Sequence, residues 1–216
     1  MPLIDSNCKY QVLHDSRKSL CFVGNTHYNK LLHNYFSTQR GCTLLTLEEL
    51  EQQSSQWIQQ HQFMSIASHC DFKYRAKTLL AQFNVTYFSV MAETAVIGHN
   101  VNIGYNTLID QYSIIWDNVG IGDHCSVASY VNVAHGTVLD ECCQVGPQCI
   151  LNFTHCNPGV YIGARTNSFG HAHAAIDIVS YTNVTSDSRV LNSITEPGTY
   201  HSNRKINESN SLELAL

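Results

Sequence analysis

The residue best suited to proton transfer is a histidine in the middle of the chain. His135 lies in the stretch VNVAHGTVLDECCQVGP, which covers residues 131–147. A neutral imidazole accepts a proton near neutral pH, so His135 is a candidate general base for an attacking amine or hydroxyl. The alternative interpretation is an incidental surface histidine.

Asp117 is the first candidate for orienting that imidazole. It stands 18 residues before His135, which is one full coil of the repeat described next, so stacking would bring the two side chains together. A carboxylate there could hold the ring and stabilise the imidazolium. Asp140 and Glu141 are alternatives, although Asp140 occupies a turn position in the repeat.

The element that must position these residues is a six-residue repeat over residues 91–156. Every sixth position holds an aliphatic or Met side chain, and the residue after it is mostly small or turn-forming. The repeated positions are Met91, Ile97, Ile103, Ile109, Ile115, Ile121, Val127, Val133, Leu139, Val145 and Leu151. This period is typical of a β-solenoid, in which three six-residue faces close one 18-residue triangular coil. We expect the repeated aliphatic residues inside the prism and His135, the third residue of its hexapeptide, at an outward-facing edge.

Residues 1–88 predict a small α/β domain before the repeat. After an irregular lead-in over residues 1–17, apolar strands alternate with amphipathic helices, which indicates a small parallel sheet of the half-Rossmann kind. The expected strands are residues 19–24, 42–45 and 62–68, and the expected helices are residues 25–36, 46–60 and 73–83. Thr46 with Glu49 three residues later forms a capping box, which marks a helix start.

The first strand ends in the tetrapeptide Gly24, Asn25, Thr26 and His27. At this place in a parallel sheet, backbone N–H groups and the helix dipole can meet a phosphate. The alternative is that Gly24 simply makes a tight turn and His27 stands near a helix start.

Composition excludes several function classes. The 216 residues carry a net charge of −5 with only 12 Lys and Arg, so no basic surface for nucleic acid is expected. No apolar run is long enough to span a membrane and no signal peptide is apparent, so we expect a cytoplasmic protein. Nine scattered Cys without a CxxC pair predict reduced thiols, with Cys125, Cys143 and Cys149 packed at small repeat positions.

The order of modules and the junction FSVMAETAVIG at residues 88–98 resemble a known family. That family comprises the sialic-acid O-acetyltransferases and the bacterial nucleotide-sugar N-acetyltransferases, including the bacillosamine-pathway enzymes, and the resemblance covers residues 19–206. It implies an α/β half-Rossmann domain over residues 1–88 and a left-handed parallel β-helix over residues 89–206. Residues 207–216 are polar and then apolar, and we expect them to form a flexible tail. Two departures are visible. The tetrapeptide at residues 24–27 keeps a single Gly of a usually Gly-rich stretch, and Ala92-Glu93 replaces a His-Pro pair.

The resemblance implies an acetyl-CoA-dependent acetyltransferase in which His135 is the general base. The acceptor would be an amino group or hydroxyl of a sugar or nucleotide-activated sugar used in surface glycans, bound at residues 24–27, with direct transfer in a ternary complex. The coenzyme groove of relatives lies between subunits, so a homotrimer is expected. The residues expected at the coenzyme are Gln144, Gly159, Gly163 and Gly170, with N–H groups near Gly159 as oxyanion donors. Gln144 matches a position where relatives carry a polar side chain close to the acetyl group, and its amide could donate to the thioester carbonyl. The alternative is that Gln144 only faces solvent.

The repeat breaks after Leu151. The stretch NFTHC at residues 152–156 is interpreted as a five-residue insertion relative to relatives, and we expect it to line the coenzyme groove. Near the end of the chain, TEPGTYHSNRKI resembles the family's closing segment, which would place Arg204 and Lys205 near the phosphates of the coenzyme.

Two other functions stay open. Twelve His residues invite comparison with the γ-class carbonic anhydrases, which are zinc enzymes on a left-handed β-helix; His155, His171 and His173 would be the candidate ligands. The third hypothesis is a non-catalytic solenoid that binds a sugar nucleotide or a partner.

Overall fold

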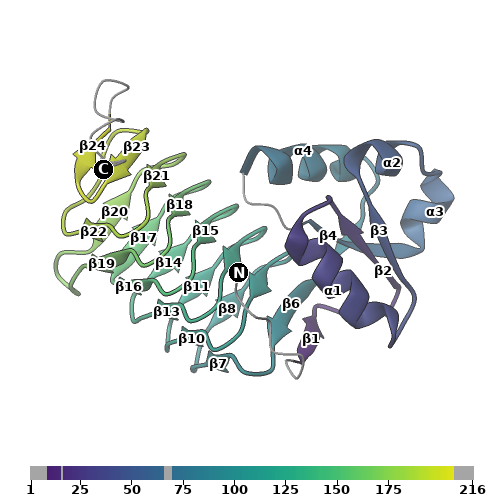
Figure 1. The fold of residues 1–216 in the computed structure, drawn as a ribbon, viewed down its shortest axis with the longest axis horizontal. Helices are drawn as coiled ribbons and strands as arrows, with labels where there is room; N and C mark the ends of the chain where they lie inside the picture. Colours follow the sequence, from purple (N-terminus) through teal and green to yellow (C-terminus); the bar gives the residue numbers. More distant parts are fainter. Residues whose placement is uncertain (1–8, 16, 66–69, 207–216) are drawn as a thin grey trace.

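The computed structural model describes residues 9–15, 17–65 and 70–206. A small α/β domain lies against the first coils of a long β-helix, and the described chain ends at the far end of that helix (Figure 1). Within the described ranges, no helix is both long and apolar enough to cross a membrane.

The N-terminal domain is a four-stranded sheet in the order β3-β2-β4-β5, and every pairing in it is parallel. Its strands are β2 (Ser19–Val23), β3 (Cys42–Leu45), β4 (His61–Ser65) and β5 (Thr86–Tyr87). Its helices are α1 (His27–Ser37), α2 (Leu47–Glu51), α3 (Ser55–Gln59) and α4 (Cys70–Ala81). The predicted α/β order is confirmed, and the long helix expected over residues 46–60 is two short helices.

Side-chain alternation along β2 divides this domain into two cores. Leu20 and Phe22 pack with α1 and with the first coil of the β-helix, whereas Cys21 and Val23 face the cluster formed with α2, α3 and α4. The predicted capping box is present, because Thr46 Oγ1 accepts from the Glu49 amide at 3.2 Å and the Glu49 carboxylate accepts from the Thr46 amide at 2.8 Å.

The rest of the chain is a left-handed parallel β-helix with three walls. Wall A contains β1 (Tyr10–Leu13), β6 (Ser89–Ala92), β9 (Leu108–Ile109), β12 (Ser126–Val127), β15 (Gln144–Val145), β18 (Tyr161–Ile162), β21 (Asn183–Val184), β23 (Thr199–His201) and β24 (Arg204–Lys205). Wall B contains β7 (Val96–Ile97), β10 (Ile114–Ile115), β13 (Asn132–Val133), β16 (Ile150–Asn152), β19 (Asn167–Phe169) and β22 (Arg189–Val190). Wall C contains β8 (Asn102–Ile103), β11 (Gly120–Ile121), β14 (Val138–Leu139), β17 (Thr154–Cys156) and β20 (Ile176–Ile178).

The predicted interior rows are confirmed. Repeat residues from Ile109 to Leu151 are buried in one continuous cluster, and Met91, Ile97 and Ile103 pack against it. Cys125, Cys143 and Cys149 are buried free thiols in the same interior.

The corners of the coils turn at a position the sequence pattern did not single out. Every sixth residue from Asn100 to Gln148 has a positive φ, and that residue is usually Asn, Tyr or His rather than Gly. The residue after each interior position is small for a different reason, which is the close approach of the next coil. A Cβ at Gly122 would stand 2.9 Å from the backbone of Asp140 and Glu141 in the next coil, so small residues there let the coils stack.

Strand β1 corrects the predicted irregular lead-in. Residues Tyr10 to Leu13 pair antiparallel with β6 and extend wall A, so the chain enters the β-helix before it builds the α/β domain.

The expected insertion over residues 152–156 is also wrong. Asn152 ends β16 and residues 154–156 form β17, and Phe153 between them turns the corner with φ 43. Leu139 pairs with Cys156 in the next coil, so these residues form part of a regular coil and no loop leaves it here. The extra residues come one coil later, between β19 and β20, where His171 and Ala174 exchange backbone hydrogen bonds of 3.0 and 2.9 Å. Residues 171–175 of this loop are exposed and carry both His171 and His173.

The interior row should supply much of the stability of the β-helix. We expect Leu139→Ala, at a residue 1% exposed, to lower the free energy of unfolding by about 2–5 kcal/mol in urea denaturation. Its neighbour Val138 is 38% exposed, and Val138→Ala should cost less than about 1 kcal/mol. Equal losses in the two variants would contradict an interior that carries the fold.

Candidate functional site

The turn between β2 and α1 is fixed by close contacts. Gly24 has φ 106, and a Cβ there would lie 2.6 Å from the Phe72 ring, so no other residue fits. The backbone N–H of Gly24 donates to the Leu45 carbonyl at 2.7 Å. The side-chain Nδ2 of Asn29 donates to the carbonyls of Val23 and Gly24 at 2.8 Å each. Because its own N–H is already used, Gly24 makes the turn and does not itself donate to a ligand.

Helix α1 starts directly after this turn. Thr26 is the N-cap, and its hydroxyl accepts from the Asn29 amide at 3.2 Å. The helix begins at His27, so the positive end of α1 lies at the carboxyl edge of the parallel sheet, where β2 has neighbours on both sides. Ligands of open parallel sheets bind at such a position.

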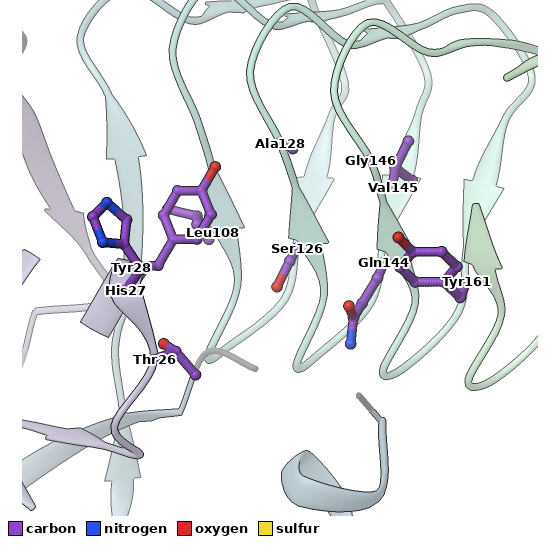
Figure 2. Close-up of a pocket in the computed structure, with 10 residues that line it drawn as sticks. All are labelled: Thr26, His27, Tyr28, Leu108, Ser126, Ala128, Gln144, Val145, Gly146 and Tyr161. Carbon is purple, nitrogen blue, oxygen red and sulfur yellow. The ribbon is translucent and has the colours of Figure 1, made fainter. Parts of the chain in front are cut away.

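A cavity of about 320 Å³ opens between this helix start and wall A. It is lined by Thr26, His27, Tyr28, Leu108, Ser126, Ala128, Gln144, Val145, Gly146 and Tyr161 (Figure 2). The lining is mostly apolar with a few polar groups, which is typical of a small-molecule site. Of the predicted acceptor site at residues 24–27, Thr26 and His27 line the cavity and Gly24 and Asn25 do not; the cavity joins the first two to Gln144, more than a hundred positions later in the chain.

Tyr28 is held against the β-helix by a buried carboxylate. Its hydroxyl donates to Asp110 at 3.1 Å, and Asp110 also accepts from Tyr10 at 2.8 Å and from Ser129 at 2.7 Å. Burial and the negative charge of Asp110 raise the pKa of Tyr28 well above its ordinary value, so the phenol stays protonated. This cluster fixes one wall of the cavity.

Two further polar side chains face the cavity from wall A. Ser126 accepts from the buried Lys73 at 2.9 Å, and Lys73 also donates to the His124 carbonyl at 2.7 Å. Gln144 is only 7% exposed, and its side-chain amide makes no hydrogen bond within the part of the chain that the structure describes. A buried amide with unmet hydrogen-bonding capacity is suited to bind a polar group of a ligand.

His135 lies elsewhere. It is exposed at the corner between walls B and C, between β13 and β14, and therefore outside the interior, as the repeat predicted. Its carbonyl accepts from the Phe153 amide at 3.0 Å, and its ring centroid is 5.0 Å from that of Trp116. This corner is opposite wall A across the triangular prism, so one chain does not bring His135 into the cavity.

Asp117 shares the corner with His135 but serves a different neighbour. Its carboxylate accepts from the His99 amide at 2.6 Å and lies 3.4 Å from the His99 ring. The hydrogen bond from the His99 amide lowers the pKa of Asp117, and the positive charge available at His135 adds a smaller effect in the same direction. Among the described residues, no hydrogen bond joins Asp117 to His135.

The three glycines assigned to the coenzyme are used by the coils themselves. Gly159, Gly163 and Gly170 donate their N–H groups to the carbonyls of Glu141, Val184 and Asn152 at 3.0, 2.7 and 2.9 Å. The Gly159 amide is therefore not a free oxyanion donor in this structure.

Solved structures show which proteins share this architecture. A histidine-to-asparagine mutant of perosamine N-acetyltransferase from Caulobacter crescentus, in complex with CoA and GDP-perosamine, matches at a TM-score of 0.75 and 11% identity, over 88% of this chain and 97% of its own. The chain has the fold of that acetyltransferase. No family model matches the sequence, and a search of curated proteins finds no relative.

Two further structures share the fold. WeeI from Acinetobacter baumannii aligns with a TM-score of 0.75 and 18% identity over 87% of this chain and 98% of its own. The acetyltransferase domain of PglB from Neisseria gonorrhoeae, in complex with acetyl coenzyme A, aligns with a TM-score of 0.62 and 12% identity over 88% and 99%. This chain thus spans nearly the full length of these acetyltransferase-fold proteins.

The histidines considered for a metal are separate on this fold. His155 lies on wall C with its Nε2 2.9 Å from Asp140 and its Nδ1 3.3 Å from Asp177, while His171 and His173 lie in the exposed loop after β19. In the ranges that the structure describes, no group of three or more His, Cys, Asp or Glu side chains could hold a metal ion.

Most residues that line the cavity carry no recognisable signal in the sequence. Tyr28, Leu108, Ser126 and Tyr161 have no motif of their own, although Ser126, Gln144 and Tyr161 occupy equivalent outward positions in successive coils of wall A. The contact of Lys73 with wall A could not be predicted, because the residues around Lys73 indicate only an ordinary helix.

The buried side chain of His124, two residues before Ser126, should make the stability of the fold depend on pH. Burial and the nearby charge of Lys77 lower the pKa of His124 to about 4, and its Nδ1 contacts Asn106 at 2.6 Å. An unfolded histidine titrates near 6.5, so the unfolded chain binds more protons between about pH 6.5 and 4, and stability falls as the pH falls through that window. We expect a loss of about 3 kcal/mol, measured by urea unfolding.

The matched variant is His124→Gln, which keeps a hydrogen-bonding side chain but does not titrate. Its unfolding free energy should vary less with pH over the same window. Parallel pH curves for the two proteins would show that His124 does not cause the effect.

Proposed function

We propose that this chain is an acetyl-CoA-dependent acetyltransferase acting on an amino group or hydroxyl of a sugar or nucleotide-activated sugar. The observation that carries the proposal is the cavity between the start of α1 and wall A. The edge of a parallel sheet, a position that often binds nucleotides, faces there a β-helix whose fold is found with CoA in perosamine N-acetyltransferase and with acetyl coenzyme A in the PglB domain. Acetyl-CoA would be a co-substrate rather than a resident cofactor.

The acceptor would occupy the cavity. The first N–H groups of α1 suit a phosphate, the apolar residues Leu108 and Val145 suit the carbon skeleton of a sugar, and Gln144 would bind one of its polar groups. In this proposal Gln144 binds the acceptor, whereas the sequence analysis expected it at the coenzyme. Free thiols at the described cysteines support a reducing compartment, such as the cytoplasm, for this chemistry.

His135 would be the general base in a direct transfer within a ternary complex. The acceptor nitrogen or oxygen attacks the thioester carbonyl of acetyl-CoA, and His135 takes the proton that the acceptor loses. The new C–N or C–O bond forms, the C–S bond breaks, and the imidazolium returns the proton to the departing sulfur. Cys142 is the cysteine closest to His135 in the sequence. It does not serve as a nucleophile, because it is buried and burial raises its pKa to about 11.

The complete site would lie between copies of the chain. The cavity on wall A and His135 at the B–C corner are on opposite sides of one prism, so a second copy must bring its corner to the first copy's cavity. Wall B offers a contact surface, since Val96, Ile114 and Ile150 are exposed along its outward ladder. Tyr112 and Tyr130 stack beside it with ring centroids 5.0 Å apart. We propose a homotrimer assembled through this surface.

The first test is CoA release measured with acetyl-CoA and a panel of amino-sugar nucleotides and sialic-acid-like sugars. His135→Ala should lower turnover by roughly 10²- to 10⁴-fold with any accepted sugar, because the attacking group then keeps its proton. The matched control is His99→Ala, an exposed histidine at the same corner, which should stay within about threefold of the unchanged chain. If none of the sugars causes release of CoA, the result would favour a non-catalytic solenoid. Full activity in His135→Ala would remove His135 from the mechanism.

The proposed assembly gives a second test. Ile150→Arg puts a charge into the exposed ladder of wall B, so light scattering should report monomers, and CoA release should fall with the loss of trimer. Val138→Arg places the same charge at a residue of similar exposure on wall C and should leave the size unchanged. A monomeric unchanged chain that still transfers acetyl groups would overturn the shared site.

A further inference from the structure

His135 has an aromatic partner where a carboxylate would be expected. Among the described residues no hydrogen bond reaches its imidazole ring, and the nearest acidic side chain at the corner, Asp117, is engaged by His99. The Trp116 ring lies with its centroid 5.0 Å from that of His135 and its plane inclined by 54°. The distance is within the range of about 6 Å from a ring centroid at which an aromatic ring attracts a cation.

The strand ladder of wall B holds the Trp116 ring in place. Its Nε1–H donates to Asn132 Oδ1 at 2.8 Å, and Asn132 pairs in register with Ile114, two residues before Trp116. Trp116 is also the one bulky residue at a repeat position where the other members are small or turn-forming. With 41% of its surface exposed, the ring stands at the corner outside the interior and can contact both His135 and a bound molecule.

The backbone of His135 is fixed from the other side. Phe153, one coil later, donates its amide to the His135 carbonyl at 3.0 Å, and its ring covers Gly136, where any Cβ would overlap it. Gly136 has φ 64, so the corner is set by glycine and by Phe153. The backbone of the histidine is thus fixed, and only the direction of its ring remains for Trp116 to set.

We propose that Trp116 is the positioning residue for His135, and that its indole face stabilises the imidazolium formed when His135 accepts the proton of the acceptor. This inference rests on the proposed function. The indole replaces the carboxylate of a histidine–carboxylate pair, and it stabilises the cation without adding a negative charge at the corner. The titratable side chains at this corner are His99 and Asp117, which interact with each other, and His171 and His173 in the loop between β19 and β20, two coils beyond His135.

Fluorescence tests the contact without any substrate. Trp57→Phe leaves Trp116 as the only indole, because the chain has two Trp residues and Trp57 stacks on His61 in the N-terminal domain. A protonated imidazole quenches an indole that it touches, so the emission of this variant should fall in one step as the pH is lowered from about 9 to about 5. Adding His135→Gln should abolish the step. A step that survives His135→Gln, or no step at all, would overturn the contact.

Kinetics test the role. Trp116→Leu should lower kcat by about two- to fivefold with little change in the KM for acetyl-CoA, and should move the acid limb of the kcat/KM profile to lower pH because the imidazolium loses support. Trp116→Phe, which keeps a weaker aromatic face, should recover part of the loss. An unchanged profile in Trp116→Leu would overturn the proposal.

The two measurements separate this proposal from the proposed function. Suppose that the fluorescence step is present but the unchanged chain transfers no acetyl group. The ring contact would then stand, while the acetyltransferase assignment and the positioning role would both be overturned. Transfer that depends on His135 but not on Trp116 would overturn the positioning role alone.

Discussion

The backbone hydrogen bonds that join one coil of the β-helix to the next hold the whole structure in place. Most corners and strands donate to carbonyls about one coil away, as Gly122 does to Leu139 and Asn132 to Cys149. These bonds fix the register, and the register stacks the interior residues in rows and the outward residues in ladders. Because amide hydrogens such as that of Gly159 are used in this way, the β-helix leaves ligand binding mainly to side chains.

The α/β domain is attached to this scaffold through buried polar groups. Lys73 of α4 donates to Ser126 in strand β12 of wall A, beside the cavity, and Asp110 of the β-helix accepts from Tyr28 of α1. Lys77 of α4 forms an ion pair with Glu141 at the corner between walls C and A. The Lys77–Glu141 pair is partly exposed, whereas Lys73 and Asp110 are buried. A buried polar group whose partner is lost costs more than an apolar contact, so the bonds of Lys73 and Asp110 specify how the two parts meet. The cavity keeps its shape because both of its sides are held in this way.

The proposed function gives a role to the apolar side chains exposed on wall B, because the cavity and His135 lie on opposite sides of one prism. An isolated chain would present Val96, Ile114 and Ile150 to water while its cavity and His135 stayed apart. A second copy would cover that surface and complete the proposed site in the same step. Oligomerisation and acetyl transfer would then depend on the same contact.

The sequence alone determined the β-helix, its interior rows and the outward direction of His135, because a strict six-residue period leaves one arrangement that buries the aliphatic positions. It also determined the parallel α/β domain and the capping box at Thr46. It misplaced the insertion, since one residue at a corner, Phe153, can turn the chain with a positive φ that the pattern of residue types does not reveal. It could not find Lys73, Ser126 or Trp116 as partners of the site. Their contacts join residues from different coils or domains, and only tertiary packing decides which side chains lie beside one another.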